Sequence, residues 1–492
     1  MAETITESLT ESLVSNCIQF HSLPCVSFGR RILYTNFDVV DESNVLNELK
    51  RVLSNHNANA QEIHYLDSYY RGNAPILYRV KKNRPEVNNK VVTNIAHYIV
   101  ETHTSEVAGE PIQYVQHGVE QKKTEEINAL NQMLADENKD YLDIELCRWR
   151  SICGTAFRFV RRDKESENGF SISVEEPETA FVCYNSNTKK PVFGCLIRKD
   201  VDGKPLYNVY TKTQFFAIKD GKIKEKSVNG LLMIPLIEYP NNARRLSDIE
   251  LTIELTDEIN TMTSDRANAV EQFVSAWIKF INCDIDIEKF RELRAEGFFK
   301  VNSNEGSENK ADVEVMTSEL NQTETQVAVD DLFQKVLILQ GIANRESNTG
   351  GDTGSAVELR NGFASEEQKA KISEPIFKRS EREMLKAILK ILKVDKAFTI
   401  SASDIEIKIT RNRNNNMLTK AEVLQILLNC GIEYSRAIKT VGLFSDPEQV
   451  AKESRERMEK LYSSKTEESS NAQSADNAQT NKVTDNGTNA EN

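Results

Sequence analysis

Cysteine pairs at metal-binding spacing are missing from this sequence. The 492 residues include eight cysteines, but no two of them form a Cys-x-x-Cys pair, and no histidine stands near such a pair at zinc-ligand spacing. This scattered pattern argues against the common structural zinc sites and fits thiols that stay reduced. We therefore expect neither a metal ion nor another cofactor.

Long hydrophobic runs are missing as well. The longest apolar run is LLMIPLI at residues 231–237, far shorter than the roughly 20 residues that cross a bilayer. The chain begins MAETITESLTES, which is polar and acidic, unlike a secretory signal peptide. From these two observations we expect no membrane partner.

Positive charge is scarce relative to negative charge. The chain carries 62 Lys and Arg against 75 Asp and Glu, which gives a net charge of −13. Proteins that hold nucleic acid by neutralising its phosphates carry an excess of basic residues. The charge balance therefore argues against an ordinary nucleic-acid binder.

The hydrophobic patterns that are present predict an α+β fold. Residues 1–40 carry little signal beyond a short extended piece, whereas helical spacing marks residues 41–56, 58–71 and 124–152. Short alternating runs then fill residues 155–239, broken by clusters of Gly, Asn and Asp. Such runs predict an antiparallel meander of strands.

A long acidic helix is predicted next. Residues 247–250 read Ser-Asp-Ile-Glu, a capping box, and apolar residues then recur every three or four positions as far as Trp277. About thirty residues would make a helix roughly 45 Å long. Its other face is either solvated in a monomer or, in a ring of such helices, the lining of a negatively charged channel. The acidic residues on it are Glu250, Glu254, Asp257, Glu258, Asp265 and Glu271.

A polar loop separates two further helical patterns, residues 325–342 and the stretch from Ser355 to about Leu392. Glycines at 350, 351 and 354 disfavour helix there. A phosphate-binding loop requires G-x-x-x-x-G-K-[ST], and no lysine follows Gly354. The loop is either a plain connector or a segment that two rigid helices present to a partner.

Two carboxylate patterns were weighed as enzyme or metal sites. Asp284, Asp286 and Glu288 alternate like the start of a calcium loop, but Lys289 occupies the place where that loop needs glycine. Residues 404–408, Asp-Ile-Glu-Ile-Lys, resemble a nuclease carboxylate–lysine set, although the polar positions of an alternating strand ordinarily face water.

The order of segments across some 380 residues resembles the portal proteins of tailed bacteriophages, in particular the type of long-tailed phages of Gram-positive bacteria. One departure is Ser105-Glu106, where the family pattern usually has a glycine–aromatic pair. The segments that carry the resemblance are YYRGNAPILYR (69–79), NNKVVTNIAHYIVETHTSEVAGEPI (88–112), LCRWRSICGTAFRFV (146–160), PLIEYPNNARRLSDIE (235–250), SDRANAVEQF (264–273), GDTGSAVEL (351–359) and the stretch from LTKAEVLQILLNCGI to KESRER (418–457).

The resemblance implies a portal-protein fold with an α/β wing, long stem helices, a small α/β clip and a helical crown. The expected parts are a poorly assigned N-terminal segment (1–40), the wing (41–246), a stem helix (247–279), the clip (280–324), a second stem helix (325–342), a tunnel loop (343–354), a long wing helix with a wing strand (355–417), the crown (418–463) and a disordered tail (464–492).

The resemblance also implies a non-enzymatic role and a set of partners. The chain would form a homo-oligomeric ring, a dodecamer by resemblance, at one capsid vertex of the virion, assembled in the host cytoplasm. Double-stranded DNA would pass through it, driven by the terminase large subunit. Major capsid and scaffolding proteins and a head-completion adaptor would contact it. The loop facing DNA would comprise Asn344, Arg345, Glu346, Ser347, Asn348, Thr349, Gly350, Gly351, Asp352, Thr353 and Gly354.

Two other classes of function stay open at this point. The first is a nucleotide- or nucleic-acid-processing enzyme that uses the glycine-rich loop or the acidic strand residues. The second is a protein-interaction scaffold that uses the long helices without forming a ring. Closed rings would separate the portal hypothesis from the scaffold, and ATP hydrolysis would separate it from the enzyme.

Overall fold

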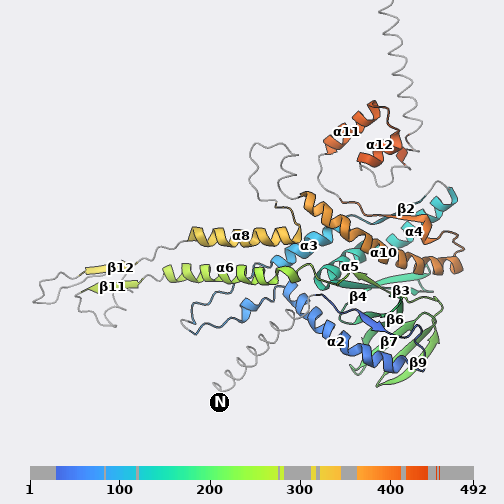
Figure 1. Cartoon of the computed structure of the whole chain (residues 1–492), viewed down its shortest axis with the longest axis horizontal. Coiled ribbons are helices and arrows are strands. Elements are labelled where there is room, and N and C mark those ends of the chain that lie inside the picture. The colour runs from blue at the N-terminus through green and yellow to red at the C-terminus, as the bar shows by residue number, and fades with distance from the viewer. Residues whose placement is uncertain are drawn as a thin grey trace, which may run out of the picture. The chain divides into compact units, whose positions relative to one another are not determined.

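The computed structural model describes residues 29–82, 85–117, 121–274, 277–281, 312–316, 322–344, 363–411 and 417–441, together with 450, 451 and 454 (Figure 1). The chain divides into two compact units. The larger one is formed by residues 1–109 and 132–402, and the smaller one by residues 110–131 and 403–492.

The larger unit combines helices with two sheets and a strand pair, which confirms the α+β class. Its helices are α2 (Val45–Tyr70), α3 (Ile95–Ala108), α5 (Lys139–Cys153), α6 (Ile253–Val274), α8 (Gln322–Gln340) and α10 (Phe363–Asp395), with short 3₁₀ turns η2 (Pro75–Tyr78) and η3 (Glu250–Thr252). Its strands are β1 (Leu33–Thr35), β3 (Thr155–Arg162), β4 (Phe170–Glu175), β5 (Ala180–Asn185), β6 (Pro191–Lys199), β7 (Pro205–Thr211), β8 (Gln214–Lys219), β9 (Lys222–Val228), β10 (Leu236–Pro240), β11 (Trp277–Ile281) and β12 (Asp312–Met316).

The predicted antiparallel meander is confirmed. A six-stranded sheet has the order β1-β5-β6-β7-β8-β9, and a three-stranded sheet has the order β10-β3-β4. Strands β5 to β9 pair antiparallel in sequence order, whereas β1 joins the edge parallel to β5. Alternate side chains of this sheet, among them Phe181, Phe193 and Phe216, pack with Val45 and Leu49 of α2 in one apolar cluster.

Helix α2 is continuous, so the prediction of two helices over 41–56 and 58–71 was wrong. Asn57, between the two predicted helices, does not interrupt the helix, and the nearby Asn59 is buried and bonds to the backbone of Arg31. Its Oδ1 accepts from Arg31 N at 2.9 Å and its Nδ2 donates to Arg31 O at 2.8 Å. Tertiary hydrogen bonding thus outweighs the weak local preference of asparagine. The predicted end at Gly72, which has a φ of 90°, is confirmed.

The helix expected over residues 124–152 is divided in two. Helix α4 (Gln121–Asp136) ends before Asn138, whose φ of 55° lies in the left-handed region, and α5 follows. Asparagine is among the residues that adopt this conformation most readily. The predicted end at Cys153 and Gly154 is confirmed, with Gly154 at a φ of 78°.

A buried network of four charged side chains joins α10 to the sheet. Arg158 of β3 donates to Asp143 of α5 at 2.5 Å, and Lys139 lies 2.8 Å from Glu381 of α10. Tyr239 also donates to Glu381 at 2.7 Å. All of these groups are nearly inaccessible to solvent, so each charge depends on its partners for solvation. The network therefore fixes α10, α5 and strands β3 and β10 relative to one another.

The smaller unit contains a two-stranded sheet and helices. Strand β2 (Gln113–Gln116) pairs antiparallel with β13 (Ile405–Lys408), and helices α11 (Met417–Asn429) and α12 (Tyr434–Val441) follow, preceded by turn η4 (Ala402–Asp404). Ile405 and Ile407 are buried whereas Glu406 is exposed, as an alternating strand requires. Within the part of the chain that the structure describes, no group of His, Cys, Asp or Glu could hold a metal ion. No described helix is long and apolar enough to cross a membrane.

His56 generates a testable pH dependence. Its ring is buried against Phe181, with 4.5 Å between ring centroids, and its Nε2 lies 2.9 Å from Glu178 O. Burial lowers the pKa of His56 from 6.5 to about 4. Above pH 6.5 the histidine is neutral in both states, but between pH 6.5 and 4 the unfolded chain binds a proton that the folded chain excludes. We expect this site to lower the free energy of unfolding by up to about 3 kcal/mol across that window.

Urea unfolding at pH 5 and pH 7 tests this expectation. His56→Gln keeps a donor for Glu178 but cannot titrate, so its loss of stability on acidification should be smaller than that of the wild type. His64→Gln, which removes an exposed histidine from the same helix, is the matched control. Equal pH slopes for wild type and His56→Gln would contradict the assignment.

Candidate functional site

Helices α6 and α8 form the pair that the sequence predicted as the stem. They lie side by side (Figure 1), and the antiparallel strands β11 and β12 follow α6 and precede α8. Ile253 and Ile259 of α6 and Val336 and Leu337 of α8 belong to one buried cluster. The 22 residues of α6 make a helix of about 33 Å.

The predicted end of the first stem helix was wrong. Helix α6 ends at Val274 rather than near residue 279, and Trp277 begins β11. The run Trp-Ile-Lys-Phe-Ile fits an alternating strand as well as a helix, and pairing with β12 selects the strand. The predicted clip, residues 280–324, lies outside the described residues apart from Phe280, Ile281, β12 and the first residues of α8.

The Glu250 half of the predicted capping box is present, but it stands at the start of the 3₁₀ turn η3, and helix α6 itself begins only at Ile253. Ser247 N donates to Glu250 Oε2 at 2.7 Å, and Ile249 N donates to Ser247 Oγ at 3.2 Å. Glu250 is buried, and its carboxylate pairs with the guanidinium of Arg30. Burial raises the pKa of Glu250, and Arg30 opposes that shift. Its assignment to an exposed acidic face is therefore wrong, because the cap turns the side chain into the protein.

The remaining acidic residues of α6 differ in their surroundings. Glu254, Glu258 and Asp265 are exposed, and their spacing of four and seven positions places them on one face of the helix. Asp257 is half-buried and accepts from Tyr69 at 2.9 Å. Glu271 is exposed and accepts from Asn89 Nδ2 at 2.6 Å.

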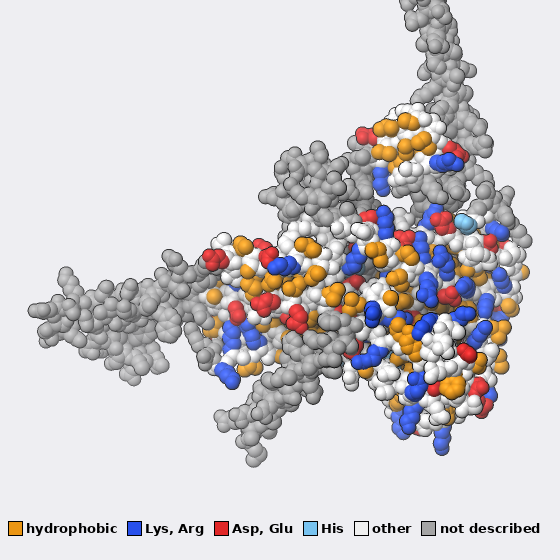
Figure 2. All heavy atoms as spheres, viewed as in Figure 1, with side chains coloured by type: hydrophobic (Ala, Val, Ile, Leu, Met, Phe, Trp, Pro, Cys, Tyr) orange, Lys and Arg blue, Asp and Glu red, His pale blue; other side chains and the backbone are white. Residues whose placement is uncertain are grey.

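Two basic residues that the sequence reading missed neutralise part of this face. Arg79 Nη1 lies 2.9 Å and Lys81 Nζ lies 3.0 Å from Asp265 Oδ1. Partial burial would raise the pKa of Asp265, but Lys81 and Arg79 outweigh it and lower the pKa. Basic and acidic side chains accordingly lie close together over the helix pair (Figure 2). Exposed carboxylates of α6 thus lie at Glu254 and Glu258 and again at Glu271, whereas Asp265 between them has two cationic partners.

An extended segment before α3 runs along α6 and is held by three buried polar side chains. These side chains are spaced four residues apart on the helix, and each accepts from one backbone N–H, so that together they bind every second N–H of the segment. We call this arrangement the polar ladder. It joins Thr93 N to Asn260 Oδ1 at 2.9 Å, Val91 N to Ser264 Oγ at 2.9 Å, and Asn89 N to Asn268 Oδ1 at 2.6 Å.

The ladder works because two repeats nearly coincide. Four residues of helix rise about 6 Å, and two residues of extended chain rise about 6.6 Å. Asn260, Ser264 and Asn268 are each at most 2% exposed, so their hydrogen bonds replace water and fix the register of the segment. The same segment carries Arg79 and Lys81 to Asp265.

Lys369 of α10 joins the two sides of the predicted tunnel loop. Its Nζ donates to Gln340 O at 2.8 Å at the end of α8, and to His103 Nε2 at 2.9 Å on α3. Gln340 Nε2 in turn donates to Asp248 O at 2.5 Å. Burial alone would raise the pKa of Asp248, but His103 and Lys369 lower it to about 2. The chain on either side of residues 345–362 is therefore anchored at one polar junction.

Most residues of the predicted tunnel loop lie outside the part of the chain that the structure describes. Asn344 is described and follows the turn at Gly341, which has a φ of 65°. Arg345, Glu346, Ser347, Asn348, Thr349, Gly350, Gly351, Asp352, Thr353 and Gly354 lie outside the described residues.

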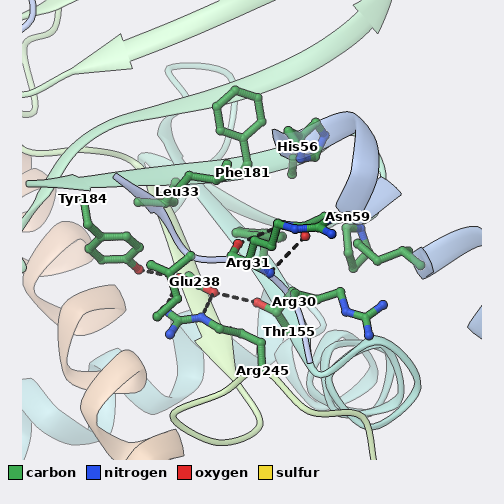
Figure 3. A pocket seen from close by; sticks show the side chains of 16 residues that line it. Arg30, Arg31, Leu33, His56, Asn59, Thr155, Phe181, Tyr184, Glu238 and Arg245 are labelled. Carbon is green, nitrogen blue, oxygen red and sulfur yellow. Dashed lines mark hydrogen bonds and ion pairs between the residues drawn. The ribbon is translucent and has the colours of Figure 1, made fainter. Parts of the chain in front are cut away.

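A small cavity near the six-stranded sheet is an alternative site (Figure 3). It measures about 30 Å³ and is lined by Arg30, Asn59 and Glu238, among other residues. Glu238 accepts from Arg245 Nε and from Thr155 Oγ1, both at 2.9 Å. Burial would raise the pKa of Glu238, but Arg245 outweighs it and lowers the pKa. A space of this size holds water rather than a substrate, and the carboxylate of Glu238 already has partners in Arg245 and Thr155.

The polar ladder can be tested by removing single rungs. Ser264→Ala and Asn268→Ala each leave a backbone N–H of the segment without its acceptor, so we expect hydrogen exchange at Val91 and Asn89 to accelerate by about tenfold, corresponding to roughly 1–2 kcal/mol. Thr261→Ala is the control, because its hydroxyl bonds only to Asp257 O within the helix. Unchanged exchange in both ladder variants would contradict the clamping role.

Comparison with known proteins places this geometry in a family. The family model of phage portal proteins, SPP1 Gp6-like, matches residues 49–462. Among solved structures, the neck of a native GTA particle computed with C12 symmetry is similar at 12% identity and a TM-score of 0.43, and the neck of an empty GTA particle computed with C6 symmetry at 12% and 0.40. Each match covers 71% of this chain and 90% of the other. No curated protein matches. The family model spans most of the chain, which therefore belongs to the SPP1 Gp6-like phage portal proteins.

Proposed function

We propose that copies of this chain close into a ring at one capsid vertex, through which double-stranded DNA is packaged and later ejected. Membership of the portal family supports a structural connector of the virion. The observation that carries the finer proposal is the α6–α8 pair with its exposed Glu254 and Glu258. Repeated around a ring, this pair lines the channel with negative charge.

The charge of such a lining decides whether DNA slides or sticks. A basic lining binds the duplex by releasing its counterions. Carboxylates repel the phosphates and keep the duplex away from the wall. Arg79 and Lys81 neutralise Asp265 in part, so the repulsion is weakened at that point of the wall. The channel therefore guides DNA without reading its sequence.

The junction at Lys369 supports the assignment of residues 344–354 as a tunnel loop. Gln340 and Lys369 lie on opposite sides of the loop in sequence, and they are bonded to each other. A loop whose ends are held in this way is presented from a fixed base, and we assign it to contact with DNA.

We assign the other parts of the chain to contacts with partner proteins. Residues 280–324 serve as the clip that meets the terminase large subunit and later the head-completion adaptor, and residues 418–463 as the crown inside the capsid. Major capsid and scaffolding proteins contact the outer part of the ring, which assembles in the host cytoplasm. The chain does this work without catalysis, a cofactor or a membrane.

Ring closure and the loop are tested together. Native mass spectrometry of the purified chain should show a closed ring, and twelve copies of the 55.8 kDa chain weigh about 670 kDa. A variant lacking residues 349–353 should form the same ring but lower the yield of packaged DNA at least tenfold. A variant lacking residues 470–474 is the matched deletion. A compact dimer would refute the ring, whereas normal packaging by the loop deletion would refute only the role of the loop.

If the channel wall is acidic, reversing the charge of its carboxylates should strengthen the binding of double-stranded DNA. The double variant Glu254→Lys/Glu258→Lys should hold double-stranded DNA more tightly at 50 mM salt than the wild type, and the gain should fall steeply as salt rises. Asp202→Lys/Glu225→Lys, which makes the same charge change at exposed sites of the six-stranded sheet region, is the control. Filter binding across a salt series gives both values, and equal affinities for the two variants would remove Glu254 and Glu258 from the channel wall.

A further inference from the structure

A groove of about 700 Å³ lies in the larger unit, between the six-stranded sheet, β10 and α10. Its apolar side chains include Val182, Ile234, Leu236 and Ile376. A groove of this volume matches a docked helix or ligand rather than a few water molecules. It plays no part in the channel proposed above.

The charge of the groove is positive. Lys189, Lys190, Lys212 and Arg379 are exposed along it. The two carboxylates that line it already have cationic neighbours, since Glu238 pairs with Arg245 at 2.9 Å and Glu383 pairs with Lys386 at 2.7 Å. Four cations beside an apolar floor fit an occupant that has both aliphatic and acidic side chains.

The first 28 residues of the chain have this chemistry. They contain no lysine or arginine. Glutamates recur every four residues, and aliphatic residues recur at the same interval, so a helix would place the two sets on different faces. The C-terminal residues 464–492 are acidic too, but their apolar residues are only alanines and a single valine. The spaced residues of the N-terminal segment are Glu3, Glu7 and Glu11, and Ile5, Leu9 and Leu13.

The N-terminal segment is also connected to the chain close to the groove. The described chain begins at Gly29, and Ile32 and Tyr34 line the groove. The residues between Leu13 and Gly29 can span up to about 50 Å when extended. A tethered segment of this kind binds at a high effective concentration, so the same chain is favoured over a second copy.

We propose that residues 3–14 dock in this groove of their own chain, with Ile5, Leu9 and Leu13 on the apolar floor and the glutamates toward the lysines and Arg379. Docking covers aliphatic surface on both sides and neutralises the groove. The family model begins at residue 49, so this contact belongs to a part of the chain outside the family match.

Photo-crosslinking in the full-length chain tests the proposal. Benzoylphenylalanine in place of Leu9 should crosslink to residues 231–237 or 372–383. In a mixture of ¹⁴N and ¹⁵N chains, the two segments joined in each product should have the same isotope content, because docking occurs within one chain.

Lys190→Glu/Lys212→Glu should lower the yield of this crosslink about tenfold, and adding Glu7→Lys/Glu11→Lys should restore much of it. Lys222→Glu/Lys224→Glu, on β9 outside the groove lining, is the control. Crosslinks to other regions, mixed-isotope products or indifference to charge reversal would overturn the proposal.

Hydrogen exchange gives a second measurement that keeps the folded chain intact. Leu9→Glu/Leu13→Glu should accelerate exchange over residues 231–237 several-fold, because the apolar face can no longer dock. Ser8→Glu/Ser12→Glu adds the same charges at the same spacing without removing an aliphatic side chain, and it should leave exchange unchanged. Equal exchange in the wild type and the leucine variant would also overturn the proposal.

Discussion

Helix α6 packs an apolar flank against α8, and an extended backbone segment covers a second flank through hydrogen bonds. The acceptors are Asn260, Ser264 and Asn268, which are buried although they are polar. Backbone N–H groups satisfy them, so no unpaired acceptor remains at these atoms. The two covered flanks leave one exposed strip, and this strip carries Glu254 and Glu258. The chemistry of the candidate channel face therefore depends on what covers the rest of the helix.

Buried charge holds the rest of the larger unit in register. Arg30 meets Glu62 and Glu250 between α2 and the start of the stem, while Arg158 and Lys139 meet Asp143 and Glu381 between the sheet and α10. Each network joins segments that are far apart in sequence. Removal of one member leaves its partner charged and out of water, which makes such networks specific for a single arrangement. They explain how long helices with few neighbours keep fixed positions.

Sequence periodicity was sufficient for the strands of the meander and for the existence of the long helices, because those features depend on neighbours within a few residues. It was insufficient where a distant partner decides the outcome. Asn59 is accommodated within a helix because its side chain bonds to the backbone of Arg31. Glu250 is buried because its carboxylate forms an ion pair with Arg30. The neutralisation of Asp265 needs Arg79 and Lys81, which lie more than 180 residues away in sequence. Trp277 starts a strand only because β12 is available to pair with it.

The small mismatch between the two repeats of the polar ladder has a consequence for its length. Each step adds about 0.6 Å of offset between helix and extended chain, so an error of more than 1 Å accumulates over three rungs. Hydrogen bonds tolerate a spread of about 0.5 Å in length, and a much longer ladder would lose its outer bonds. Over this short span the two repeats stay in register, and a shift by half a rung would misalign all three bonds at once. A helix fastened in this way resists sliding along its own axis relative to the extended segment.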